Sequence, residues 1–301
     1  SLGSTTVKTA LFHPGRIGAP TQISDRARFD GNRMHTAVCE PEEMHHRYVV
    51  PPKPSDYPFA IEGSNSAMCA ALKDAGVKGY SGKKKDQLVE MCREHLPTRN
   101  LWTDVLSDFS RNNGGKQFVS EAEWDEMHRV ADAVMAHPVI QSEGIFSKGV
   151  GEASFFAEVE FPNLFGSFKM KARPDWLQHD RVTDLKTWKG GKPLDAFRFQ
   201  ADSLHYDLSA AHYLAVLEAH GRNPDNRFTW VVVDKSTMSD GGHVVIHVAT
   251  LSPKFLAQGR EKLECALERI SLWENAPRVY ETQHQIEHIA EPPRREWRTG
   301  L

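Results

Sequence analysis

Residues 173–187 have the sequence RPDWLQHDRVTDLKT. Asp175 and Asp184 lie nine positions apart in it, and Lys186 follows two residues after the second aspartate. Apolar residues flank the polar segment 178–180, which predicts a hairpin with its turn there. A symmetric register then places Asp175 directly across from Asp184, and strand alternation puts Lys186 on the same face as Asp184. The stretch therefore gathers two carboxylates and an ammonium group on one face of a sheet.

This charge pattern favours a cation site. Two carboxylates that face each other destabilise a sheet, and a divalent cation between them removes that cost. Carboxylate oxygens are ligands that Mg²⁺ or Mn²⁺ prefers, and a nearby lysine can orient an attacking water during phosphodiester hydrolysis. The Leu185 side chain is expected in the core, with its backbone carbonyl as a further ligand. An Asp-x-Lys triplet alone is more often an ordinary surface hairpin, and a bulge at Pro174 would shift the register.

The whole chain has the composition of a globular protein. It contains 301 residues with 40% hydrophobic residues and a formal net charge of -3, so contact with nucleic acid would depend on local basic patches. Its four cysteines show no metal-binding or iron–sulfur spacing, which favours a reducing cytoplasm. We expect neither a membrane span nor a signal peptide, because no run of about 18 apolar residues occurs.

Helical patterns dominate the first half of the chain. Periodicity predicts helices over 24–40 and 120–136, the second with a Ser120/Glu123 capping box. The proline-rich segment 51–58 is expected to be a linker or an ordered loop. Residues 64–96 look like a small helix–loop–helix unit, with Gly76 ending its first helix, Ser81 as a possible cap, and a second helix over 83–95.

Extended patterns follow. Segments 151–161, 166–177 and 181–188 predict a three-stranded meander. A long helix over 202–220, strands over 228–235 and 243–251, and a terminal helix over 253–275 complete the pattern. The predicted class is α/β (α+β), with a central mixed sheet flanked by helices.

A spaced set of motifs carries a family resemblance. It comprises Gly31-Asn-Arg-Met-His35, Glu40-Pro-Glu-Glu, Lys171-Ala-Arg-Pro-Asp175, Asp184-Leu-Lys186-Thr and Tyr213. In this order the set resembles the PD-(D/E)xK nucleases, and among them the RecE, or exonuclease VIII, C-terminal nuclease group. The resemblance spans about residues 24–290 and implies a restriction-endonuclease-like core.

The resemblance implies roles for individual residues. Asp175 and Asp184 would be metal-binding carboxylates, Lys186 the lysine that positions water, and His35 a metal ligand or a close neighbour of the metal. A histidine satisfied by its helix neighbours is the alternative for His35, and Glu40 is expected to close the helix end. Two acids, Glu152 and Glu158, compete for the position of a strand acid that often precedes the hairpin.

A helix after the hairpin supplies a further element. Tyr213 matches the tyrosine of a Q-x-x-x-Y motif, and the resemblance assigns it to the catalytic site. Ser209 occupies the glutamine position, where the family makes a phosphate or lysine contact, and is therefore the DNA-binding candidate on this helix.

The helix–loop–helix unit looks like an insertion. Its segment 72–92 resembles modules of the SAP and Rho N-terminal type, whose loop and second helix meet the DNA backbone. Lys83, Lys84 and Lys85 would grip phosphates there, and a solvated lysine run is the equal alternative. The expected division is 1–63 as an N-terminal helical part of the nuclease domain, 64–96 as the insertion, and 97–301 as the nuclease core.

The function implied is a Mg²⁺- or Mn²⁺-dependent exodeoxyribonuclease. It would degrade one strand of linear double-stranded DNA from a free end, 5′ to 3′ by resemblance, and leave an overhang for a RecT-like single-strand annealing protein. The family forms homo-oligomeric rings around DNA. The alternatives are an endonuclease of restriction or repair type, and a DNA-binding protein with an inactive nuclease fold. The basic segment 292–298 could touch DNA or be a plain tail.

Overall fold

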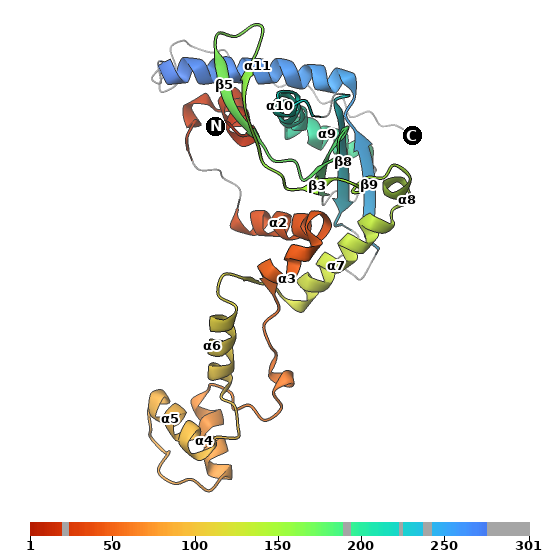
Figure 1. Ribbon diagram of the computed structural model, residues 1–301. Helices are drawn as coiled ribbons and strands as arrows, with labels where there is room; N and C mark the ends of the chain where they lie inside the picture. Colours follow the sequence, from red (N-terminus) through yellow and green to blue (C-terminus); the bar gives the residue numbers. More distant parts are fainter. Residues whose placement is uncertain (20–23, 189–193, 223–224, 237–242, 276–301) are drawn as a thin grey trace, which may run out of the picture.

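The computed structural model describes residues 1–19, 24–188, 194–222, 225–236 and 243–275 (Figure 1). Its centre is a five-stranded sheet with the order β3-β6-β7-β8-β9. These strands are β3 (Val150–Gly151), β6 (Trp176–Leu177), β7 (Arg181–Trp188), β8 (Arg227–Asp234) and β9 (Val245–Thr250). β7 and β8 run parallel, whereas the other neighbouring pairs are antiparallel. The predicted mixed sheet is confirmed.

Helices cover both faces of the sheet (Figure 1). One face packs on α1 (Ser4–Phe12), α9 (Leu194–Ser203), α10 (Tyr206–Glu218) and α11 (Pro253–Asn275). The other face packs on α2 (Asp25–Cys39), α3 (Met44–Arg47), α7 (Glu121–Ala136) and α8 (Pro138–Ser142). β8 alternates accordingly: Trp230 and Val232 join the first core, and Val231 and Val233 join the second. A strand buried on both faces explains the continuous apolar run in its sequence.

The expected three-stranded meander is only partly correct. β4 (Phe155–Glu160) and β5 (Ser167–Ala172) pair with each other in a separate two-stranded sheet, and only β3, β6 and β7 enter the central one. The break between β5 and β6 falls at residues 173–175. Pro174 lies in this break, because it has no amide hydrogen to donate to a ladder.

The helical unit stands away from the sheet (Figure 1). It contains α4 (Asn65–Asp74), α5 (Lys85–His95) and α6 (Trp102–Asn112). The core of this unit includes Ile61 and Leu101, which lie outside the range 64–96. Its two connections to the rest of the chain pair in parallel as β1 (Tyr48–Val49) and β2 (Gln117–Phe118), and we call this pair the stem.

Two of the three predicted signals at helix ends are confirmed: Ser120 and Glu123 form the capping box of α7, and Gly76 has a φ of 74° after α4. Ser24, the first residue of the predicted helix, caps α2 by accepting from the Ala27 amide. The predicted cap at Ser81 is wrong. α5 begins at Lys85 with Lys84 as N-cap, because Gly82, with a φ of 73°, keeps the preceding residues in a turn.

The predicted helix over 202–220 is also wrong in its extent. α9 ends at Ser203 and α10 begins at Tyr206. His205, which caps α10, has a φ of 53°, a left-handed conformation that no continuous helix can contain. The terminal helix and the strands β8 and β9 match their predicted positions closely.

Within the part of the chain described above, no helix is both long and apolar enough to cross a membrane.

Candidate metal site

The hairpin has the register that the sequence predicts. Trp176 pairs with Thr183 and Leu177 with Val182, so the same register continued by one residue sets Asp175 across from Asp184. Asp175 lies just outside β6, and its Oδ2 accepts a hydrogen bond from the Leu185 amide at 2.6 Å. This bond holds the first carboxylate against β7. The two carboxylates are buried and lie close enough that the Asp175 charge adds to the raised pKa of Asp184.

Three potential ligands meet beside this hairpin. His35, Glu152 and Asp175 each offer one ligand atom within 4.8 Å of the others. His35 Nδ1 lies 3.1 Å from Asp175 Oδ1 and 3.5 Å from Glu152 Oε1. Of the two competing acids the structure brings Glu152 to the site, whereas Glu158 lies on β4 and hydrogen-bonds to Ser167.

The backbone of Glu152 is held in an unusual conformation. Its φ is 52°, which costs a non-glycine residue about 1 kcal/mol or more. The Glu152 amide donates to the Asp175 carbonyl at 3.1 Å, and Arg173 binds the Glu152 carboxylate at 2.7 Å. These contacts hold the Glu152 side chain, which is 14% exposed, toward His35.

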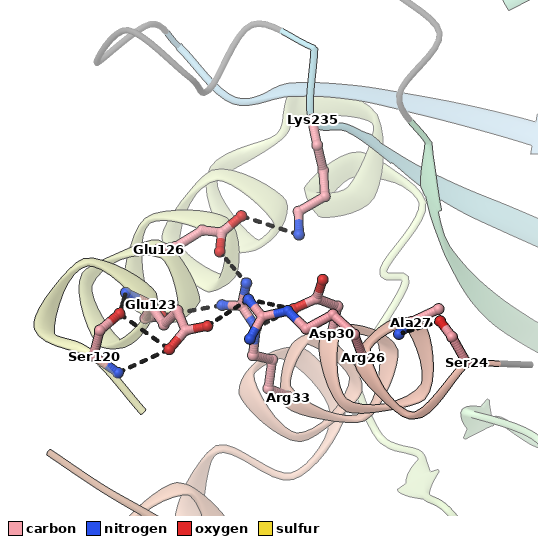
Figure 2. Close-up of polar contacts among 9 residues, drawn as sticks. All are labelled: Ser24, Arg26, Ala27, Asp30, Arg33, Ser120, Glu123, Glu126 and Lys235. Atoms are coloured by element: carbon pink, nitrogen blue, oxygen red, sulfur yellow. Dashed lines mark hydrogen bonds and ion pairs between the residues drawn. The ribbon is translucent and has the colours of Figure 1, made fainter. Parts of the chain in front are cut away.

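α2 presents His35 because its other face is anchored. Figure 2 shows Arg33 of α2 bound to Glu126 of α7, whose second oxygen binds Lys235 at 3.0 Å. Arg33 also reaches Asp30 Oδ1 and the Glu123 carbonyl, both at 3.2 Å. Two helical residues turn the chain by about 200°, so His35 projects from roughly the opposite face of α2.

Lys186 lies on the other side of the carboxylate pair. Its Nζ is 2.5 Å from Asp184 Oδ2 and 3.4 Å from the Leu185 carbonyl. The Leu185 side chain is fully buried, as predicted, which leaves its carbonyl beside the site. Lys186 Nζ also lies 5.5 Å from the ring centroid of Tyr206, a favourable cation–π geometry.

Burial and charge shift the pKa values in this row of groups. Burial alone would lower the pKa of His35, but the Asp175 carboxylate raises it to about 10. Burial would raise the pKa of Asp175, yet His35 and Lys186 lower it to about 2. Burial raises the pKa of Asp184 to about 6, with Asp175 adding to the effect and Lys186 opposing it. The metal-free site therefore holds a proton on His35 at neutral pH.

Three residues near the site were missed from the sequence: Tyr206, Lys8 and Arg173. Tyr206 precedes Tyr213 by seven positions, or about two helical turns. This spacing places both side chains on one helix face, so Tyr206 could have been predicted from the position of Tyr213. Lys8 Nζ lies 5.4 Å from the Tyr206 ring centroid and donates to the Leu204 carbonyl at 2.7 Å. Burial, reinforced by Lys186, lowers the pKa of Lys8 to about 8. No local pattern marks Lys8, because only packing brings α1 here.

Tyr213 lies close to the carboxylates, is partly buried and packs against the first core. Burial raises its pKa, as do the charges of Asp184 and Asp175. Ser209 lies on the same side of α10, partly exposed, and its hydroxyl makes no hydrogen bond to any residue that the structure describes. Glu40 caps the end of α2, as expected, and binds Arg47 at 2.6 and 2.8 Å.

The remaining basic candidates lie elsewhere. Lys83, Lys84 and Lys85 are exposed at the start of α5, in the helical unit away from the sheet. The segment 292–298 falls outside the described residues.

The donor set fits a hard divalent cation. Two carboxylates, one imidazole and the nearby Leu185 carbonyl offer mainly oxygen, the ligand type that Mg²⁺ and Mn²⁺ favour. His35 must lose its proton before its Nδ1 can bind a cation. No cysteine contributes to the three-residue cluster.

Comparisons with known proteins give only distant matches. No protein-family model and no curated protein matches the chain. A putative exonuclease from Eubacterium rectale matches with 14% identity over 90% of this chain and 97% of that one, with a TM-score of 0.37. An alkaline exonuclease from Laribacter hongkongensis matches with 13% identity over 75% and 97%, with a TM-score of 0.26. Matches this weak carry no conclusion about activity.

Proposed function

We propose that this protein is a divalent-cation-dependent exodeoxyribonuclease of PD-(D/E)xK type, similar to the RecE group. The observation that supports the proposal most is the row of His35, Asp175, Asp184 and Lys186. These groups come from three places in the fold: His35 from α2, Asp175 from the break before β6, and Asp184 and Lys186 from β7. Each group lies close to the next one in the row. An ordinary surface hairpin would not bury both carboxylates.

Each residue would have a distinct task. Asp175, Glu152 and His35 would hold the cation, with Asp184 and the Leu185 carbonyl completing its surroundings. A cation bound there would lower the pKa of a water and offset negative charge on the scissile phosphate. Lys186 would orient the attacking water, and Tyr206 would keep the Lys186 ammonium in place through its ring.

The substrate and partners follow from the resemblance. We propose that the protein degrades one strand of linear duplex DNA from a free end, in the 5′ to 3′ direction. A single-strand annealing protein of RecT type would use the overhang, and a homo-oligomeric ring would keep the enzyme on DNA. Lys83, Lys84 and Lys85 would add phosphate contacts outside the site.

The decisive experiment uses a linear duplex labelled at either 5′ end and a covalently closed circle. The native protein and Asp184→Ala are compared in Mg²⁺, in Mn²⁺ and in chelator. We expect cation-dependent loss of the linear duplex only, with a rate reduced by about 10³-fold or more in the variant. The order in which label appears in short products gives the polarity.

Two results would contradict the proposal. Cleavage of the closed circle would indicate an endonuclease. Duplex binding that survives chelator, with no cleavage in either metal, would indicate a DNA-binding protein with an inactive site.

A further inference from the structure

A cleft of about 550 Å³ opens from the metal site toward the stem. Its lining includes the candidate ligands His35, Glu152 and Asp175, together with residues of α3 and of the stem such as His46 and Gln117. The stem of the helical unit therefore lines the same cleft as the candidate ligands, although the helices of the unit stand away from the sheet (Figure 1).

Three polar side chains in this cleft have no partner. Asn32, His46 and Gln117 are exposed, and none forms a side-chain hydrogen bond or ion pair with the residues the structure describes. Arg47 and Arg173, in contrast, are already bound to Glu40 and Glu152. Amide and imidazole groups of this kind contact phosphates and sugars in nucleic-acid complexes.

Gly31 leaves open space beside the candidate ligand. It lies one turn before His35 on α2, about 6 Å along the helix axis. A glycine inside a helix is unfavourable relative to alanine, and a Cβ at Gly31 would meet nothing within 4 Å. Neither packing nor helix geometry explains the glycine, whereas close passage of a ligand would.

The charge of the cleft favours an anionic occupant once a cation is present. Three carboxylates, from Glu40, Glu152 and Asp175, face the guanidinium groups of Arg47 and Arg173. With the proton on His35 counted, this part of the cleft is formally neutral, and it becomes positive when a divalent cation replaces that proton. We infer that one strand of DNA crosses α2 over Gly31 and lies in this cleft, contacted by Asn32, His46 and Gln117. The inference rests on the proposed function and names the path by which the strand reaches the site.

Binding tests this path without cleavage. Fluorescently labelled single-stranded and duplex oligonucleotides are titrated with the native chain in Ca²⁺, which also takes oxygen ligands. Two variants are compared with the native chain. One is the single substitution Gly31→Val, and the other combines Asn32→Ala, His46→Ala and Gln117→Ala. We expect each to raise Kd about tenfold, equivalent to about 1.4 kcal/mol, with an unchanged melting temperature. Gly31→Ala should melt at a higher temperature and bind more weakly.

Matched controls lie away from the cleft. Ala257→Val adds bulk to an exposed position of α11, and His179→Ala removes an exposed imidazole at the hairpin turn; both should bind as the native chain does. Native affinity in both cleft variants, or no binding of any oligonucleotide in Ca²⁺, overturns the inference. If the native chain cleaves DNA but the cleft variants bind oligonucleotides with native affinity, the proposed strand path is wrong and the nuclease proposal stands. Binding that depends on the cleft, without cleavage in any metal, supports the path and defeats the nuclease proposal.

Discussion

The candidate site is a row of charged groups in which two carboxylates, Asp175 and Asp184, lie between two cationic groups, His35 and Lys186. Each group is partly or fully buried, so the charges act on one another more strongly than they would in water. The row consists of two parts, a candidate cation-binding part and an ion pair beside it. His35 and Asp175 belong to the cluster suited to a cation, whereas Lys186 binds Asp184 beyond that cluster.

The proton on His35 makes the metal-free protein sensitive to alkaline pH. Its folded pKa of about 10 lies above the unfolded value, so the stability that it contributes is complete below about pH 6.5 and is lost as pH rises to about 10. We expect the free energy of unfolding in chelator to fall between pH 7 and 10, by at most about 1.4 kcal/mol per pH unit.

His35→Gln should lack this contribution, as measured by urea unfolding at several pH values. Lys8, with a folded pKa lowered to about 8, has the opposite effect, since its contribution grows as pH rises above 8. Lys8 is present in both proteins, so the difference between them isolates His35. Parallel pH profiles would show that His35 carries no such proton.

Lys186 should affect the rate of cleavage rather than the affinity for the cation. Lys186→Met removes the group proposed to orient water, and we expect the rate to fall about 10²- to 10⁴-fold. Mn²⁺ affinity, measured by calorimetry, should stay the same or increase, because a neighbouring positive charge is lost. Lys8→Met is the matched control, since Lys8 lies over the Tyr206 ring as Lys186 does but, among the described residues, forms no ion pair with Asp184. Equal losses in the two variants would contradict the role given to Lys186.

At the scale of elements, α2 joins the two halves of the site. Its Arg33 face binds α7, and through Glu126 it reaches Lys235 just after β8 (Figure 2). The Lys235 amide donates to the carbonyl of Trp188, the last residue of β7, at 2.6 Å. The helix that carries His35 is thus tied to the strand pair that carries Asp184 and Lys186.

Breaking this buried network should destabilise the fold strongly. The Arg33 side chain is only 3% exposed, so Arg33→Met leaves Glu126 short of a partner, and we expect a loss of about 3–5 kcal/mol in chemical unfolding. The neighbouring Arg26, 64% exposed, pairs with Glu123 on the same two helices. Arg26→Met is the matched control and should cost less than about 1 kcal/mol. Similar costs in both variants would show that burial does not distinguish the two pairs.

At the scale of the whole molecule, the helical unit has its own small core and reaches the rest of the chain through the stem. The unit carries the exposed Lys83, Lys84 and Lys85 at the start of α5, and its stem lines the cleft beside the candidate ligands. Under the proposed function, this arrangement would separate sequence-independent affinity from cleavage.

The lysine contacts should appear in the salt dependence of binding. Replacing Lys83, Lys84 and Lys85 by alanine should weaken duplex binding and reduce the slope of log K against log salt by up to about 3. Cation affinity should not change. Lys73→Ala, an exposed lysine of the same unit that lies on α4 rather than in the loop or on α5, is the control. An unchanged salt slope in the triple variant would indicate that these lysines are simply solvated.

Local spacing determined a large part of this structure. The hairpin register, the shared face of Asp184 and Lys186, and the cap at Ser120 all depend on residues close together in the chain, whose geometry a strand or helix period sets. The break at His205 was not visible, because a left-handed residue leaves the apolar pattern on either side nearly intact.

Only the tertiary structure decided which distant groups complete the site. His35, Glu152 and Lys8 come from three separate segments, and their spacing in sequence carries no information about distance in space. Packing of α2 against α7 and of α1 against α11 brings these side chains to the hairpin. Glu152 rather than Glu158 faces His35 because a left-handed residue ends β3 there, whereas Glu158 follows the separate hairpin outward. Periodicity specifies the face of an element, and the packing of the elements determines what that face meets.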